Sequence, residues 1–140
     1  MSHSGSCLCG AISYEISAEP ALILHCHCGM CRKAHGAAFA TYAYVSPESF
    51  HWRAGEEILS RYESSPGIER HFCSRCGSQL GATYAGISIF GFTLATLEDR
   101  AGLRPSEHIF ADSKAPWHEI TDALPQFEEG SGTTYALFGV

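Results

Sequence analysis

The 140-residue chain has little positive charge: nine lysines and arginines stand against fifteen aspartates and glutamates, giving a formal net charge of −6 with histidine neutral. Domains that bind nucleic acids usually carry a basic patch, so this composition argues against DNA or RNA as a partner. The sequence also lacks an apolar run of about 18 residues, which argues against a membrane-spanning helix. Residues 1–6 contain no apolar core, so we expect no secretory signal and a cytoplasmic location.

Helical periodicity is scarce, and internal repeats are absent. Short alternating or β-branched and aromatic runs recur instead, separated by glycines, and such runs are typical of strands. They predict strands at 12–16, 21–24, 39–45, 58–62, 68–72 and 87–94. One short helix is predicted over 30–35, ended by Gly36, and further helical turns after Pro116. The fold class is therefore mainly β, built of short antiparallel strands.

The length is that of one ordinary domain, and no linker or change of composition divides the chain before residue 128. We expect residues 1–128 to form this single domain. Glycines at positions 130 and 132 flank a serine, a composition typical of flexible segments. Residues 129–140 are therefore predicted to be a C-terminal tail.

The sequence also has no isolated cysteine, because all seven cysteines lie in three tight clusters. The clusters are Cys7 and Cys9; Cys26, Cys28 and Cys31; and Cys73 and Cys76. An odd number of cysteines in a reducing compartment argues against a disulfide framework. A thioredoxin-like redox role for the last pair is not favoured either, because no βαβ pattern surrounds it. Thiolates spaced in this way can converge on a soft cation, and zinc is the usual one.

Two of the clusters are pairs, and a glycine follows each pair. The chain can turn between Cys73 and Cys76, and Gly77 permits a positive φ that lets backbone N–H groups point at the sulfurs. Cys7 and Cys9 are residues i and i+2 of an extended segment, so they face the same side. Together the two pairs supply four thiolates, which predicts a closed, structural zinc site.

The middle cluster differs because Cys26, Cys28 and Cys31 leave no cysteine for a fourth ligand. Zinc with three protein ligands and one exchangeable position is the arrangement that catalytic sites use. Three thiolates make the metal a weak Lewis acid, which suits it to hold a substrate thiol as a nucleophilic thiolate.

Two alternatives for this middle cluster stay open from spacing alone. Cys7 and Cys9 could complete the middle cluster instead of joining Cys73 and Cys76. A histidine could also supply a fourth ligand and close the site. The histidines near a cluster in the sequence are His25, His27, His35 and His71.

The segments around the cysteines, 5–12, 25–33 and 70–78, resemble the glutathione-dependent formaldehyde-activating enzyme family. That family shares a domain with a vertebrate centromere protein and has the Mss4-like fold. The likeness continues to 124–127 and so covers nearly the whole chain. It implies two Zn²⁺ per chain, with the same division into four and three cysteines. The implied structural ligands are Cys7, Cys9, Cys73 and Cys76, and the implied ligands of the open zinc are Cys26, Cys28 and Cys31.

The resemblance also implies a reaction and its small-molecule partners. The family's reaction joins glutathione and formaldehyde into S-hydroxymethylglutathione, and in the reverse direction it is a carbon–sulfur lyase. A zinc-held thiolate that attacks a small carbonyl agrees with the chemistry of three cysteines. We therefore predict a zinc-dependent carbon–sulfur lyase that acts on a small thiol adduct. The alternative is a non-catalytic zinc module that serves protein interaction or a chaperone-like role, which the Mss4-like fold also permits.

Five further residues are candidates for the substrate site. Glutathione carries two carboxylates, so cations near the open zinc are candidates to bind it: Arg32, Lys33 and Arg70. Trp117 is a candidate for one wall of the pocket. His27, between two cysteines, is a candidate to relay a proton at about neutral pH.

Overall fold

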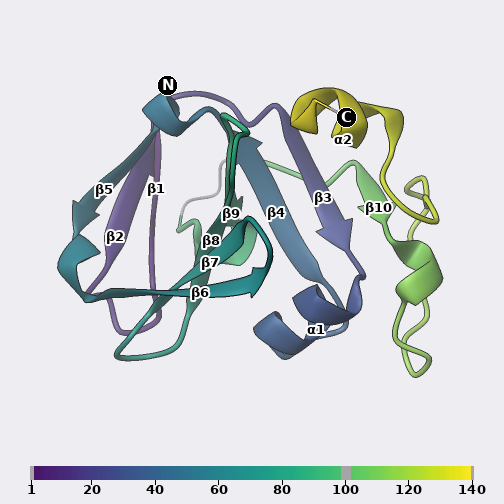
Figure 1. The fold of residues 1–140 in the computed structure, drawn as a ribbon, viewed down its shortest axis with the longest axis horizontal. Coiled ribbons are helices and arrows are strands. Elements are labelled where there is room, and N and C mark those ends of the chain that lie inside the picture. Colours follow the sequence, from purple (N-terminus) through teal and green to yellow (C-terminus); the bar gives the residue numbers. More distant parts are fainter. Residues whose placement is uncertain (1, 99–101, 140) are drawn as a thin grey trace.

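The computed structural model describes residues 2–98 and 102–139 as two β-sheets with two short helices (Figure 1). The smaller sheet is antiparallel in the order β1 (His3–Ser6), β2 (Ser13–Ile16) and β5 (Phe50–Ala54). The larger sheet has the order β10 (Glu107–Ile109), β3 (Leu22–Cys26), β4 (Ala40–Val45), β9 (Phe90–Thr93), β8 (Gln79–Tyr84), β7 (Ile68–Cys73) and β6 (Leu59–Ser65). Its paired strands are antiparallel except β10 and β3, which are parallel.

The helices are short and lie at opposite ends of β3 and β4: α1 (Gly29–His35) follows β3, and α2 (Gly132–Phe138) lies near the other end (Figure 1). The described residues also form 3₁₀ turns: η1 (Pro47–Ser49), η2 (Glu56–Ile58) and η3 (Leu94–Thr96) lie between strands, and η4 (Ala111–Ser113) follows β10. Within the described ranges, none of the helices is long and apolar enough to cross a membrane.

The larger sheet buries different residues on its two faces, because side chains alternate along a strand. On β4, Ala43 and Val45 belong to a core that includes Tyr14 of the smaller sheet and Phe92 of β9. Tyr42 and Tyr44 of the same strand, together with Leu24, belong to a second core on the opposite face. The first core lies between the two sheets. The second is covered only by the short helices and the C-terminal segments.

The predicted fold class is confirmed, since the chain is mainly β with antiparallel sheets. Each of the six predicted strands overlaps an observed one, and α1 lies where a helix was expected. The prediction of helical turns after Pro116 is wrong, because the backbone makes a simple turn there. Four strands were not predicted, namely β1, β5, β8 and β10.

The segment expected to be a tail contains α2. The Ser131 hydroxyl accepts the Thr134 backbone N–H (3.1 Å), and the Thr134 hydroxyl accepts the Ser131 N–H (3.3 Å), a reciprocal capping box that begins the helix. Phe138 then packs edge-on against Tyr44 and Tyr84, with ring centroids 5.4 and 4.9 Å apart. The helix thus packs on the second core, and the domain boundary at residue 128 stays a prediction.

Candidate active site

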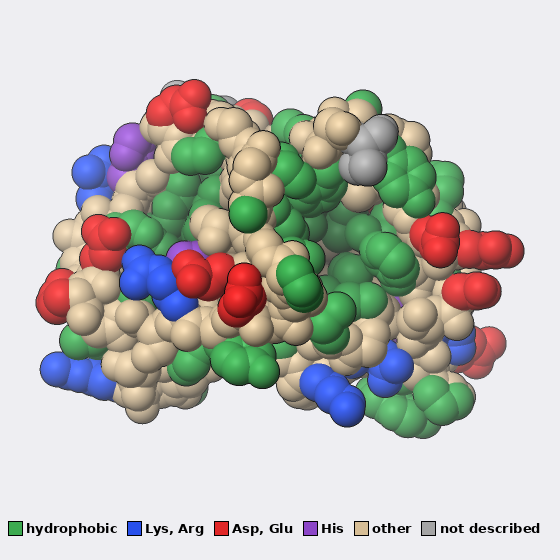
Figure 2. Space-filling view, in the orientation of Figure 1, with side chains coloured by type: hydrophobic (Ala, Val, Ile, Leu, Met, Phe, Trp, Pro, Cys, Tyr) green, Lys and Arg blue, Asp and Glu red, His purple; other side chains and the backbone are tan. Residues whose placement is uncertain are grey.

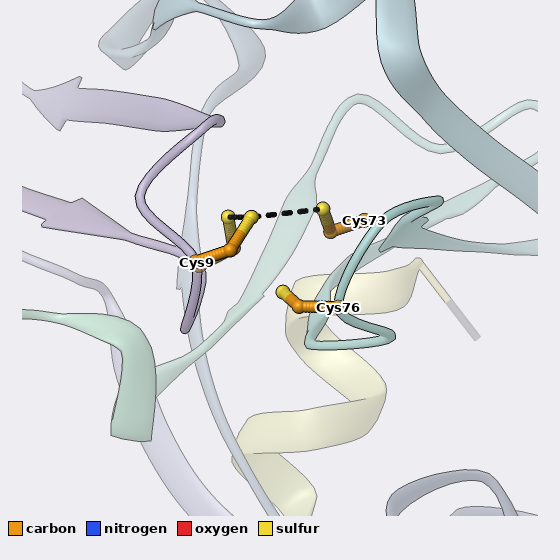
Figure 3. A group of neighbouring side chains, drawn as sticks. Cys9, Cys73 and Cys76 are labelled. Atoms are coloured by element: carbon orange, nitrogen blue, oxygen red, sulfur yellow. Dashed lines mark hydrogen bonds between the residues drawn. The ribbon is translucent and has the colours of Figure 1, made fainter.

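Four cysteines from two distant loops converge in one cluster. Figure 3 shows Cys9, Cys73 and Cys76 pointing toward one another, Cys9 from the loop after β1, Cys73 from the end of β7 and Cys76 from the turn that follows it. The sulfurs of Cys7 and Cys9 are 3.6 Å apart and those of Cys9 and Cys73 are 3.9 Å apart. All four sulfurs lie within 4.8 Å of one another. A tetrahedral zinc with sulfur ligands places them about 3.8 Å apart, so this donor set fits zinc.

The backbone around these cysteines favours thiolates. Gly77 has φ +78°, as the sequence predicted, and this conformation closes the turn around the sulfurs. The Ile12 N–H donates to the Cys7 sulfur at 3.3 Å. Hydrogen bonds from the Ser78 hydroxyl and backbone N–H lower the pKa of Cys76 to about 5. The Cys76 thiol is therefore prepared to lose its proton to a metal.

The position of this cluster suits a structural metal site. Cys7 and Cys9 follow β1 of the smaller sheet, whereas Cys73 is the last residue of β7 in the larger sheet. A metal held by these residues would join the two sheets. Since the cluster contains four thiolates, it has a full set of ligands for a tetrahedral ion.

The other three cysteines come from one continuous segment. Cys26 ends β3, and Cys28 caps α1 by accepting the Cys31 N–H at 3.3 Å. The sulfurs of Cys26 and Cys31 are 3.5 Å apart, and all three lie within 4.8 Å of one another. The helix ends after two turns at Gly36, whose φ of +59° is left-handed. This donor set also fits zinc.

The geometry bears on both alternatives that spacing left open. Cys7 and Cys9 group with the pair after β7 and not with the middle cluster. Over residues 2–98 and 102–139, the group that could hold a metal at the middle cluster contains three cysteines and neither a histidine nor a carboxylate. Three protein ligands leave one coordination position for an exchangeable group.

Arg70 of β7 connects the three cysteines to a buried polar network. Its side chain donates to the Ser64 hydroxyl and to the Tyr42 hydroxyl, both at 2.9 Å, and to the Cys31 sulfur at 3.6 Å. Since a guanidinium only donates, the Tyr42 oxygen accepts from Arg70, and the His35 ring nitrogen lies 3.0 Å from the same oxygen. Burial first, and then the charge of Arg70, lowers the pKa of His35 to about 4, so this imidazole is neutral at pH 7.

In the middle cluster the pKa of Cys28 is lowered, whereas the pKa values of Cys26 and Cys31 are raised. Hydrogen bonds from the thiols of Cys26 and Cys31 lower the pKa of Cys28, and Arg70 adds a smaller contribution of the same sign. The same interactions, together with burial, raise the pKa of Cys26. Arg70 lies next to these sulfurs and contacts that of Cys31.

A cavity of about 390 Å³ opens beside these cysteines. Its walls include all three cysteines, the tyrosines of β4 and β8, and residues of α2. Figure 2 shows hydrophobic side chains gathered in a hollow on this face of the molecule. The cavity thus gives a small molecule access to the middle cluster.

The predicted substrate residues are only partly brought together. Arg70 lines the cavity, whereas Lys33 lines a neighbouring groove that shares Arg70 with it. Arg32 donates to the His27 backbone carbonyl at 3.3 Å. Trp117 is 72% exposed and lines neither space.

His27 is fully buried and does not line the cavity. Its Nε2 lies 2.8 Å from Nδ1 of His108, and Nε2 of His108 lies 3.0 Å from both carboxylate oxygens of Asp122. His108 and Asp122 were not singled out from the sequence, and neither was Tyr42. The pairing of His108 with His27 follows from the parallel pairing of β10 and β3, which no local pattern indicated.

The fold and these clusters define a small β domain with a closed four-cysteine centre and an open three-cysteine centre. The family model of the glutathione-dependent formaldehyde-activating enzyme matches residues 2–113, and the chain belongs to this family. A Halomonas elongata protein, named provisionally as such an enzyme, is 34% identical over 83% of this chain and 79% of its own length.

Two further proteins are similar to this chain. An uncharacterised lyase of Schizosaccharomyces pombe is 32% identical over 59% of this chain and 58% of its own length. A crystal structure of a Rhodobacter sphaeroides protein matches 88% of this chain and 98% of its own, with a TM-score of 0.61 and 24% identity. At that identity the likeness bears on the fold alone.

Proposed function

We propose that the chain is a zinc-dependent carbon–sulfur lyase that makes and breaks the bond between a small thiol and a carbonyl carbon. The observation that carries the proposal is the three-cysteine cluster beside a cavity, with no fourth protein ligand in the described part of the chain. Glutathione and formaldehyde, which the family's name supplies, are the reference substrates, and S-hydroxymethylglutathione is their adduct.

Two Zn²⁺ per chain form part of the proposal. Cys7, Cys9, Cys73 and Cys76 would hold the structural ion. Cys26, Cys28 and Cys31 would hold the other. When bound there, zinc keeps a substrate sulfur deprotonated yet nucleophilic at neutral pH.

The reaction balances without a redox partner. In the cleavage direction the carbon–sulfur bond breaks, its electron pair stays on sulfur, and the hydroxyl proton passes to water as the carbonyl forms. Arg70 lies beside the three cysteines, and its positive charge stabilises the charge that develops on the substrate sulfur. Tyr42 and Ser64 fix the guanidinium in place. Tyr42 contacts both Arg70 and His35, and in the proposed reaction its role is to position the guanidinium.

Metal content and rate together test this proposal. The wild type should bind about two zinc ions and Cys28→Ser about one. The wild type should also accelerate formaldehyde release from S-hydroxymethylglutathione, followed by NMR exchange, whereas Cys28→Ser should not. Protein stripped of zinc by a chelator measures the spontaneous reaction. Two bound zinc ions with no acceleration and no thiol binding would contradict an enzymatic role.

The alternative of a non-catalytic interaction module makes a different prediction, since it requires four protein ligands on both metals. The proposed enzyme acts on small-molecule partners only. A cytoplasmic location, where thiols stay reduced, is also part of the proposal, and all seven cysteines are free thiols in the structure.

A further inference from the structure

The cavity beside the three cysteines is apolar almost throughout. Its walls carry Ile68, Ala82, Ile87 and Phe138, along with tyrosine rings whose flat faces are also apolar. Among the described residues that line it, Arg70 is the one charged side chain. A ligand with ionised groups would lose its hydration on entry and find little in return.

Arg70 can replace that hydration only in part, because three of its five N–H donors are already used. Each of its three side-chain nitrogens already donates, to Ser64, Tyr42 and Cys31 respectively. The charge is balanced as well. Three thiolates and one divalent ion carry a net charge of −1, which the guanidinium of Arg70 compensates. The site therefore holds no surplus cation for a substrate carboxylate.

Glutathione fits this environment poorly, because it carries two carboxylates and one ammonium group. Lys33, another of the predicted cations, lines the neighbouring groove and is exposed to solvent. Pairing of a carboxylate with such an exposed lysine contributes little. An organic group without charge would instead gain from leaving water.

The far wall of the cavity is built by residues outside the part that the family model matches. That match ends at residue 113, whereas Thr134, Tyr135 and Phe138 of α2 all line the cavity. The Thr134 hydroxyl donates to the buried Glu107 carboxylate of β10 at 3.4 Å, which ties α2 to the sheet. The wall that sets the cavity's chemistry is thus supplied by this chain's own C-terminal helix.

Phe110 adds a strained wall to the same cavity. Its φ of +53° is left-handed, and Phe110 is the one described non-glycine residue with a positive φ. Such a conformation is unfavourable for a bulky residue and persists only when its surroundings impose it. Backbone hydrogen bonds to Glu129 and Phe127 hold the turn at Phe110 and Ala111. The strain places an aromatic ring in the cavity wall.

We infer that the thiol used by this site is uncharged and carries an apolar group, for which a benzyl ring is a suitable probe. This inference rests on the proposed function, because it assumes that a substrate sulfur meets the three cysteines. The apolar group would fill the cavity against the contacting rings of Tyr84 and Phe138, while its sulfur reaches the cluster of Cys26, Cys28 and Cys31. Apolar ligands of this kind bind in cavities with few polar groups.

Calorimetric titration of the zinc-loaded full chain tests the inference. Benzyl mercaptan should bind at least about 10-fold more tightly than glutathione, because only glutathione must desolvate ionised groups. Benzyl alcohol, which has the ring but no thiol, should compete with benzyl mercaptan. Phe138→Ala should weaken benzyl mercaptan by about 5- to 10-fold and leave glutathione unchanged. Trp117→Ala, an aromatic truncation outside the cavity, should change neither Kd.

A second variant keeps the test decisive if Phe138→Ala disturbs folding. Ile87 lies in the loop between β8 and β9 at the cavity wall, so Ile87→Lys adds a cation there. In this variant the ratio of the glutathione Kd to the benzyl mercaptan Kd should fall by about 10-fold or more. Equal or tighter binding of glutathione by the wild type would overturn the inference, as would a loss of glutathione binding in Lys33→Ala.

The outcomes separate this inference from the proposed function. Tight glutathione binding with cleavage of S-hydroxymethylglutathione would refute the apolar substrate and leave the lyase standing. If Cys28→Ser binds benzyl mercaptan as well as the wild type does, and neither adduct is cleaved, the lyase itself fails. Binding of benzyl mercaptan that depends on both Cys28 and Phe138 supports both.

Discussion

The two cysteine clusters use the same ligand in different surroundings. The four-cysteine cluster draws its ligands from two loops about 64 residues apart and lies where the smaller sheet meets the larger one. The three-cysteine cluster comes from one segment of six residues and opens on a cavity. A ligand set gathered from distant parts of the chain stabilises the fold. A set gathered locally contributes less to it and can leave one side accessible.

The two faces of the larger sheet show the same contrast. One face is covered by the smaller sheet, and Phe92 there is fully buried. The other face carries Tyr42 and Tyr44 and is covered incompletely by two helices of seven residues each. The incomplete cover leaves the cavity in which we place the chemistry.

The largest effect should come from breaking the four-cysteine cluster. Cys73→Ser should lower the free energy of unfolding by at least about 5 kcal/mol, because metal binding contributes directly to folding at such sites. Cys28→Ser should cost about 2 kcal/mol or less, since serine also caps helices well. Urea unfolding of zinc-loaded proteins, followed by circular dichroism, measures both. Equal losses in the two variants would remove the distinction between the clusters.

The second largest difference in stability is expected between the two faces of the larger sheet. Phe92→Ala should destabilise the protein by about 3–5 kcal/mol, as expected for a fully buried aromatic residue. Phe138→Ala should cost about 1 kcal/mol, because this ring borders a cavity and is only half-buried. Thermal unfolding of the two variants provides the comparison. A larger loss for Phe138 would mean that the second face is the main core.

Arg70→Lys tests whether the fixed guanidinium contributes to catalysis at the three-cysteine site. Lysine keeps the charge but cannot donate to Ser64, Tyr42 and Cys31 in one fixed arrangement. We expect about a 10-fold loss in kcat for adduct cleavage, or about 1.4 kcal/mol, with both zinc ions retained. Unchanged kcat would show that the guanidinium is a structural group only.

The smallest effect concerns His35 and pH. Its folded pKa of about 4 lies below the ordinary value of 6.5, so the unfolded chain binds the proton more readily. Stability should therefore fall as pH drops through 6.5 toward 4, by about 1 kcal/mol at pH 5.5. His35→Gln should remove this contribution. Acid release of zinc affects both proteins alike, so only the difference in their pH profiles is interpreted. Parallel profiles would show that His35 has no such role.

Much of the fold could be predicted from local patterns. The alternation in 12–16 and the aromatic run in 39–45 both correspond to observed strands. β10 escaped prediction because Glu107 and His108 are polar and yet buried, with partners far away in the sequence. α2 escaped because two glycines flank the Ser131 cap, and the helix packs through distant tyrosines.

The candidate site was likewise predictable where it depends on local sequence, and not where it depends on distant segments. Spacing and family resemblance pointed to the grouping of the seven cysteines, because ligand spacing is a local property. The surroundings of Arg70 and the burial of His27 depend on strand register, which brings residues from distant segments together. The cavity depends on α2 as well, so the sequence alone gave no view of its apolar character.

X-ray absorption at the zinc edge tests the central claim most directly, since it counts the ligands of both metals at once. With four cysteines on one zinc and three on the other, the mean should be about 3.5 sulfurs per zinc. Saturation with a thiol substrate should raise it to about 4 in the wild type. A mean that does not change with thiol, with both zinc ions held by four protein ligands, would contradict an open second site.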